Sequence, residues 1–151
     1  MKPFDLGAAL LAKHAQHVVL IHFPIALFLI GVAFDLASRW TRRQSLAAAA
    51  YYNLTVAAVS TVPAVATGLL AWQLQLEGQK LKGVLLLHLV LGVTSSALIW
   101  LVWWLHKRAR GTPGQAVPAY RLPIELLAAA LVALTGHLGG FLSGVNLPGA
   151  N

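Results

Sequence analysis

The sequence predicts an all-α integral membrane protein, built as a bundle of four transmembrane helices. Hydrophobic residues make up 58% of its 151 residues and charged residues only 10%, whereas soluble domains are about 25% charged. Four apolar stretches are also long enough to cross a bilayer, which takes about 20 residues of helix. So few charges cannot cover a water-exposed surface. The composition therefore disfavours a soluble enzyme and a nucleic-acid partner, and indicates the lipid bilayer.

The four expected spans cover residues 17–38, 46–72, 83–105 and 122–143. The first and third end in tryptophan and basic residues, which is typical of the membrane–water interface. The second is rich in alanine and valine, and the fourth carries several glycines. Residues 1–16 are only modestly apolar, so they are expected to lie as an interfacial helix. We expect residues 1–151 to form one membrane domain, with residues 111–118 as its linker.

The basic residues predict the orientation. Seven cations follow the first and third spans or precede the fourth, whereas four lie on the opposite side. Cytoplasmic loops collect lysine and arginine. Both termini are therefore expected on the outer, periplasmic side of a bacterial inner membrane.

The six histidines are the main candidates for function. His22, His88 and His137 fall on three different spans, at one level about 8–9 Å below the outer boundary at helical rise. His17 lies nearer the surface, and its side chain points about 140° away from that of His22 on a regular helix. Polar residues at membrane depth usually face the bundle interior and mark a site. His106, beside Lys107, is expected in a solvated cationic rim.

Neutral imidazole binds haem iron, copper or zinc. The chain has no cysteine, which excludes disulfides, iron–sulfur clusters, c-type haem attachment and thiol catalysis on this chain. The histidines at one level therefore indicate a metal or haem site. The alternative is that each imidazole forms a structural hydrogen bond to a neighbouring helix.

Two acidic residues lie within the expected spans. Asp35 is four residues from Arg39, and Glu125 is four residues from Arg121. This spacing predicts two ion pairs at helix ends, and no proton relay to the histidines near the outer side.

Two further features suit a flat, bulky cofactor. Gly136, Gly140 and Gly144 form a smooth face with G-x-x-x-G spacing, which would leave room for a macrocycle or serve close helix packing. Lys80 and Lys82 lie at the end of the bundle where haem propionates would be met, or simply in a solvated loop.

A weak internal repeat relates the first and third spans. When His22 is aligned with His88, the basic residues that follow each span also come into register. This register predicts that His22 and His88 occupy equivalent positions.

The run from His17 to Leu27, HVVLIHFPIAL, resembles the signature of a bacterial four-helix membrane family of unknown function. That family also carries T-G-x-x-G-G near its end, which Thr135, Gly136, Gly139 and Gly140 match. Val18 stands where the family usually has proline. Members look like companions of redox proteins such as c-type cytochromes, so the resemblance implies a place in electron transfer.

These observations favour a membrane subunit that binds one or two b-type haems for electron transfer in a larger complex. His22 with His88 or His137 is the first candidate ligand pair, and His17 the candidate for a second haem. Other membrane subunits, a c-type cytochrome or quinone are the expected partners, and no independent catalytic activity is expected. The alternatives are a copper or zinc site formed by the same histidines, and a structural subunit without a cofactor.

Overall fold

The computed structural model describes residues 15–75, 78, 80–110, 118 and 120–143. Within these residues the chain forms four α-helices, α2 (Ala15–Thr41), α3 (Gln44–Gln75), α4 (Gly83–Arg110) and α5 (Arg121–Leu142). The helices cover the four expected spans, and all four are long and apolar enough to cross a membrane. The all-α, four-span architecture is therefore confirmed. Nearly all of the expected interfacial helix and of the expected linker lie outside the described residues, and residues 15–16 begin α2.

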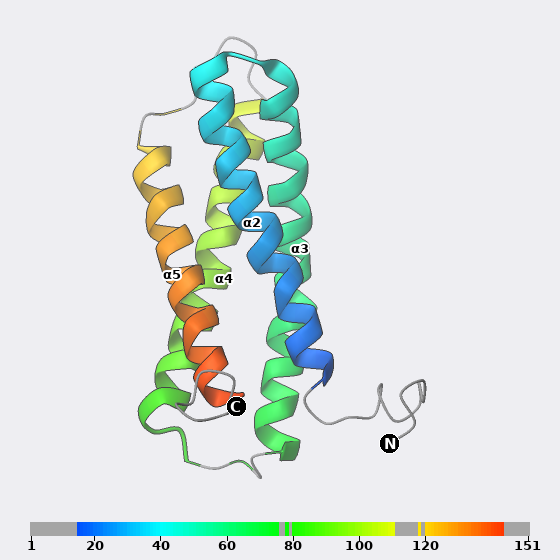
Figure 1. Cartoon of the computed structure of the whole chain (residues 1–151), viewed down its shortest axis with the longest axis vertical. Coiled ribbons are helices and arrows are strands. Elements are labelled where there is room, and N and C mark those ends of the chain that lie inside the picture. The colour runs from blue at the N-terminus through cyan, green and yellow to red at the C-terminus, as the bar shows by residue number, and fades with distance from the viewer. Residues whose placement is uncertain (1–14, 76–77, 79, 111–117, 119, 144–151) are drawn as a thin grey trace, which may run out of the picture.

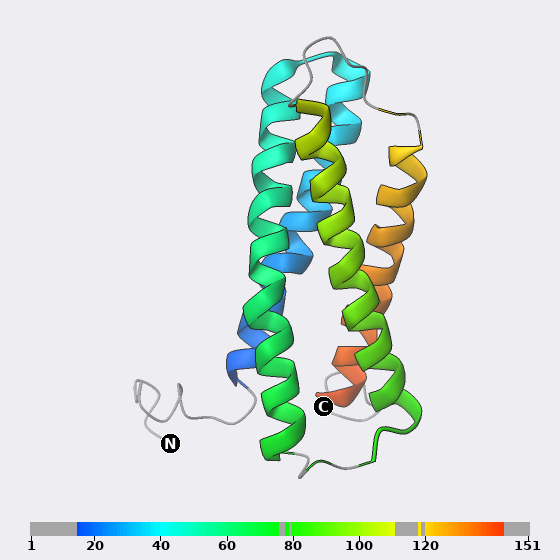
Figure 2. The same ribbon diagram turned by 180° about the vertical axis from the view of Figure 1, so that it is seen from behind.

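The four helices run alternately up and down along one long axis (Figure 1). The α2 helix packs most extensively on α3, and α4 packs on α5. Smaller contacts between α3 and α4, and between α2 and α5, close the ring. The reverse view shows α4 in front, between α3 and α5 (Figure 2). The bundle is therefore two helical hairpins, α2–α3 and α4–α5, placed side by side.

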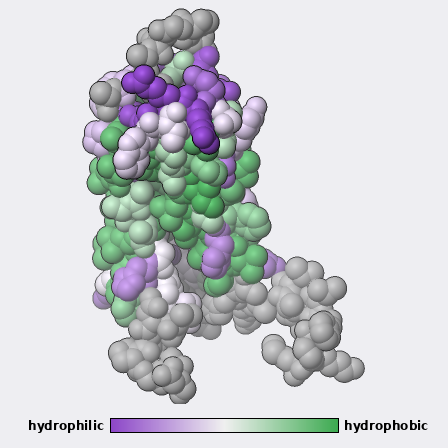
Figure 3. All heavy atoms as spheres, turned by 45° about the horizontal axis from the view of Figure 1, so that its top comes forward, coloured by the Kyte–Doolittle hydropathy of each residue, from purple (hydrophilic) through white to green (hydrophobic). Residues whose placement is uncertain are grey.

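The two ends of the bundle differ in chemistry. The cationic end holds the α2–α3 turn, the last turn of α4 and the first turn of α5, with Arg39, Arg42, Arg43, Lys107, Arg108, Arg110 and Arg121. The histidine end holds the first turns of α2 and α4. Hydrophilic residues gather at the cationic end, while the visible sides of the bundle are largely apolar (Figure 3). This is the distribution expected for a bundle that crosses a bilayer.

The apolar core joins all four helices in their middle part. Its members are buried and mostly aliphatic or small: Phe28, Val32, Leu54, Ala57, Ala58, Ile99, Val102, Ala128 and Val132. Alanines at such positions let helix backbones approach closely, which is how membrane helices gain packing energy. Many larger apolar side chains point outward instead, among them Val59 and Leu87, which are 58% and 49% exposed. These outward side chains provide the apolar surface that lipid would cover.

Polar side chains inside the bundle are paired between helices. The indole nitrogen of Trp103 donates to Thr55 Oγ1 at 3.1 Å, and that of Trp100 donates to Thr61 Oγ1 at 3.0 Å. Both bonds tie α4 to α3. Since hydrocarbon offers no alternative partner, such bonds fix how neighbouring helices are placed along and around one another.

The close contact between α2 and α3 predicts different effects for two glycine substitutions. A Cβ added at Gly31 would lie 3.0 Å from two Leu54 side-chain atoms, whereas one at Gly92 would lie 3.8 Å from its nearest neighbour, in Thr135. Alanine raises helix propensity at both positions. Gly31→Ala should nevertheless be less stable than Gly92→Ala by about 1–3 kcal/mol because it overpacks the interface.

The measurement is unfolding of each purified variant in mixed micelles, compared with the unaltered chain. Equal stability of the two variants would show that Leu54 moves aside without cost.

Candidate functional site

At the histidine end, His17 is held by the second helix of its own hairpin. Its Nδ1 lies 3.2 Å from Thr67 Oγ1. The Thr67 hydroxyl already donates to the Pro63 and Ala64 carbonyls, and the Ala64 carbonyl also faces the His17 ring. Because the hydroxyl proton is engaged, we assign Nδ1–H of His17 as the donor to Thr67. The remaining lone pair of the ring is then on Nε2.

His88 is also held at Nδ1 by the second helix of its own hairpin, here by a backbone carbonyl. Its Nδ1 lies 3.1 Å from the backbone oxygen of Thr135. A carbonyl can only accept, so Nδ1 carries the proton and Nε2 the lone pair. The Thr135 side chain adds a 3.1 Å hydrogen bond to Ser95 of α4. A hydrogen bond at Nδ1 that fixes the ring and leaves Nε2 free of a proton is the usual arrangement of a metal-binding histidine.

Each ring lies against a glycine of the partner helix. A Cβ at Gly68 would approach Cε1 of His17 to 2.9 Å, and a Cβ at Gly139 would approach Cε1 of His88 to 3.2 Å. The first distance is too short for any real side chain. Gly68 is therefore required for the observed position of His17, and Gly139 leaves His88 little spare room.

His17 and His88 also lie close enough for a charge on one to act on the other. Both rings are half-buried. The two histidines come from different halves of the bundle, since α2 and α4 belong to different hairpins. The structure thus has, near this end of the bundle, two half-buried imidazoles whose Nδ1 atoms are both engaged.

In the structure, the internal repeat aligns His88 with His17 and not with His22. The expected equivalence of His22 and His88 is wrong, because the structure relates His88 to His17. In both hairpins a histidine of the first helix is hydrogen-bonded to a Thr-Gly dipeptide of the second, Thr67-Gly68 or Thr135-Gly136. The sequences HVVL from His17 and HLVL from His88 match this new register.

The other two candidate ligands lie elsewhere. His22 is exposed, and its Nδ1 donates to the Val18 carbonyl of its own helix. His137 is also exposed, and its ring packs edge-to-face on Phe141 with centroids 5.0 Å apart. The structure therefore does not place either ring in the bundle interior with His17 and His88.

The expected cofactor-contacting residues are distributed as follows. Gly136 faces α2, where a Cβ would lie 3.6 Å from Ile25, an ordinary packing distance. Gly140 is half-buried, and its carbonyl accepts a 3.1 Å hydrogen bond from Ser143. Lys80 and Lys82 are exposed, before the start of α4. Gly144 lies outside the described residues. Gly136 thus takes part in helix packing, and the contacts of the two lysines with a cofactor stay a prediction.

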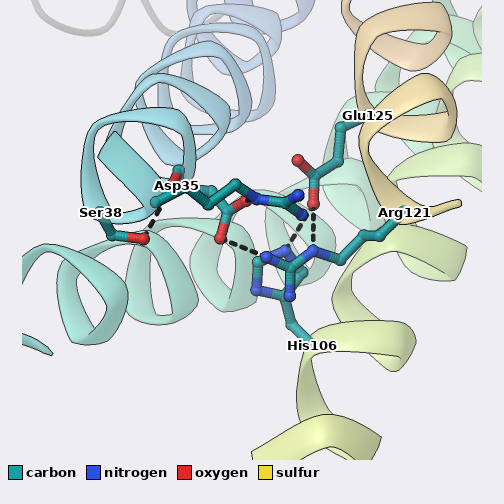
Figure 4. A network of polar contacts seen from close by, with 6 residues as sticks. Asp35, Ser38, His106, Arg121 and Glu125 are labelled. Carbon is teal, nitrogen blue, oxygen red and sulfur yellow. Dashed lines mark hydrogen bonds and ion pairs between the residues drawn. The ribbon is translucent and has the colours of Figure 1, made fainter. Parts of the chain in front are cut away.

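At the cationic end the structure contains a buried polar network that joins three helices (Figure 4). The predicted pairs are present: Arg39 lies 2.8 Å from Asp35, and Arg121 lies 2.8 Å from Glu125. The two pairs are linked, because Arg121 also donates to Asp35 at 2.6 Å. His106 of α4 lies 2.8 Å from Glu125. Glu125 is fully buried, so its charge is balanced inside the protein.

The expectation that His106 belongs to a solvated rim is wrong. Its side chain is 5% exposed and its Nε2 is paired with Glu125. Lys107, the next residue, lies over the Trp103 ring at 5.0 Å and is exposed. Adjacent residues of one helix face different directions, so proximity to Lys107 in sequence does not indicate exposure. A signal was present in the sequence: His106, Asp35 and Glu125 all fall at the same end of their spans.

Asp35, His106 and Glu125 are the one group of three potential metal ligands that converge within the described residues. However, the guanidinium of Arg121 is already bonded to both carboxylates. A metal ion would have to displace this cation, and the network is balanced with it in place. The cluster is therefore best understood as an ion-pair network that joins α2, α4 and α5.

The fold and the two polar clusters define a four-helix membrane protein with histidines near one end and buried ion pairs near the other. Residues 13–145 match the family model described as "Predicted membrane protein (DUF2231)". The chain therefore belongs to this family, whose function is unknown. No curated protein matches the chain significantly. No solved structure does so either.

The network predicts that the two ion pairs of Asp35 differ in their contribution to stability. Asp35→Asn removes the charge that faces Arg121, whose side chain is 4% exposed, and leaves a buried cation partly unbalanced. The expected loss is about 3–5 kcal/mol of unfolding free energy. Arg39→Gln removes a partner that is 32% exposed and should cost about 1 kcal/mol or less.

Unfolding of the purified variants in mixed micelles measures both values. Similar losses for Asp35→Asn and Arg39→Gln would show that water reaches Arg121 and that the network does not hold the helices together.

Proposed function

We propose that this protein is a membrane subunit that binds b-type haem between His17 and His88 and passes electrons within a larger redox complex. The proposal is carried by one observation. Two half-buried imidazoles, one from each hairpin, lie near the same end of the bundle and within range of each other's charge, and both are held at Nδ1 by the neighbouring helix. This leaves both Nε2 atoms suited to act as ligands.

The number of ligands favours haem over zinc. A structural zinc site needs four protein ligands and a catalytic one needs three. Within the described residues, no third histidine, aspartate or glutamate converges with His17 and His88. Haem would require only two ligands from the protein, and His17 and His88 would supply them. A copper ion held by the same pair is the second candidate, although the chain has no cysteine and its one methionine is Met1.

Bound haem would supply a one-electron redox couple, and two histidine ligands leave it no open position. The role of this chain is then to hold and orient. Thr67 and the Thr135 carbonyl set the direction of the two rings, and Gly68 and Gly139 provide the space in which the rings lie.

Electron transfer requires partners that reach this site. Both candidate ligands lie near the same end of the bundle, within about one to two turns of the start of α2 and α4. With the cationic end in the cytoplasm, the histidine end faces the periplasm of a bacterial inner membrane. A c-type cytochrome or another membrane subunit would approach from that side, and quinone would approach through the bilayer.

The first test is the spectrum of each histidine variant. In membranes from cells with ample haem supply, the unaltered chain should show a reduced-minus-oxidised α band. His17→Leu and His88→Leu should each abolish this band or convert it to a high-spin form, because one axial ligand is lost. His22→Leu is the matched control, since His22 is exposed on the same helix as His17, and it should keep the spectrum.

Protein levels must be measured by immunoblot in the same membranes. Loss of haem from His22→Leu alone would support the ligand pair expected from the sequence, His22 with His88 or His137. Unaltered spectra in all variants, or an absence of haem from the unaltered chain, would contradict the proposal. One copper per chain in elemental analysis would instead support the second candidate.

The proposed orientation has its own test. A reporter fused after Asn151 should be active only when it requires the periplasm, because seven of the eleven basic residues lie at the opposite end. A matched fusion in the α2–α3 turn, after Arg43, should be active only in the cytoplasm. The reverse pattern would place the histidine end in the cytoplasm.

A further inference from the structure

A cavity of about 500 Å³ lies at the cationic end, where all four helices contribute residues. Three alanines, Ala47, Ala48 and Ala109, line part of its wall. Their small side chains leave the space open. Volumes of about 300–1,000 Å³ are typical of ligand sites. The cavity is therefore large enough for a phosphate group together with the alcohol that is esterified to it.

The charged lining of this cavity is strongly unbalanced. Five arginines line it, Arg39, Arg42, Arg43, Arg110 and Arg121, together with a single carboxylate, Asp35. That carboxylate is already paired with Arg39 and Arg121. The remaining three arginines have no carboxylate partner among the described residues. Several cationic charges therefore face one cavity without an anion of the protein to balance them.

The fold holds the guanidinium of one of these arginines and the backbone of another. The Arg110 guanidinium lies 4.4 Å from the centroid of the Tyr51 ring and 5.9 Å from that of Tyr52. Arg42 has a backbone φ of 56°, an uncommon conformation for a residue other than glycine. It closes the two-residue turn that brings Arg42 and Arg43 to the start of α3. The positive charge at the cavity is thus arranged by structure and not only by composition.

The tryptophans at this end indicate that the cavity lies at the level of lipid headgroups. Trp40 is 93% exposed and Trp104 is 45% exposed at this end, and tryptophans collect at the membrane–water interface. Arginines bind phosphate oxygens with paired hydrogen bonds, and basic pockets between membrane helices recognise anionic headgroups.

We propose that this arginine-lined cavity binds the phosphodiester headgroup of an anionic phospholipid. Arg42, Arg43 and Arg110 would contact the phosphate, while the Asp35–Arg121–Glu125 network keeps the floor of the cavity in shape. This site is independent of the proposed haem site, which lies at the other end of the bundle, so either proposal can fail without the other.

The test is titration of the purified full-length chain in detergent with phosphatidylglycerol, followed by native mass spectrometry. Phosphatidylglycerol should be retained in preference to phosphatidylcholine. Arg42→Gln and Arg110→Gln should each weaken its binding about fivefold. Arg108→Gln is the matched control, because Arg108 lies over Trp104 at 5.4 Å and does not line the cavity, and it should bind as the unaltered chain does.

Circular dichroism of each variant shows whether the helices are intact. Loss of Arg110 removes its contact with the Tyr51 ring and could disturb the fold. Arg42 lies in an exposed turn, so Arg42→Gln tests the cavity without that effect. An equal loss of binding in Arg108→Gln would show general surface attraction and overturn the proposal, as would unchanged binding in both cavity variants. Displacement of phosphatidylglycerol by millimolar inorganic phosphate, with equal protection against unfolding, would assign the cavity to a soluble phosphate and overturn its assignment to lipid.

Discussion

In hydrocarbon, a polar side chain has no water to bind, so each one must find its partner within the protein. The guanidinium of Arg121 meets most of this constraint for two carboxylates at once, because it is ion-paired with Asp35 of α2 and with Glu125 of its own helix. Nε of Arg121 and Oε2 of Glu125 are the buried side-chain atoms that stay without a hydrogen-bond partner among the described residues. His106 of α4 completes the set. The α2 and α5 helices have few contacts with each other, so this network is a main connection between these two helices. The α3 and α4 helices are joined separately, by the Trp103–Thr55 bond and by Arg110 on the Tyr51 ring. The shape of the arginine-lined cavity depends on the network as well.

The same constraint acts differently at the histidine end. His17 and His88 have no acidic partner among the described residues, and each is held through Nδ1 by the second helix of its own hairpin. These bonds fix the rings, but each bond lies within one hairpin and does not join the two hairpins to each other. A ligand bound between them would supply the connection that the ion-pair network supplies at the other end. The bundle is thus joined by its own charges at one end, and the proposed haem would join it at the other.

The two hairpins use similar means to place their histidines. In both, a Thr-Gly dipeptide lies on the second helix, and in both the ring lies close to a glycine. The spacing differs, since His17 contacts Gly68 directly after Thr67, whereas His88 contacts Gly139, one turn after Thr135. An approximate twofold relation between hairpins would explain why one histidine comes from each. It also accounts for the short matching sequences HVVL and HLVL.

The sequence by itself determined the four spans, the cationic end and the pairs Asp35–Arg39 and Arg121–Glu125, because these follow from hydropathy and from spacing within one helix. The sequence also showed that His17 and His22 point about 140° apart on one helix. Only one of them can therefore face a given neighbouring helix. Which of the two faces inward depends on how α2 is rotated about its axis, and that is decided by packing on α3, where Gly68 makes room for His17. The burial of His106 and the bridge from Arg121 to Asp35 were likewise decided only by the tertiary structure. Both depend on contacts between different helices, and residue spacing within one helix does not indicate which helices are neighbours.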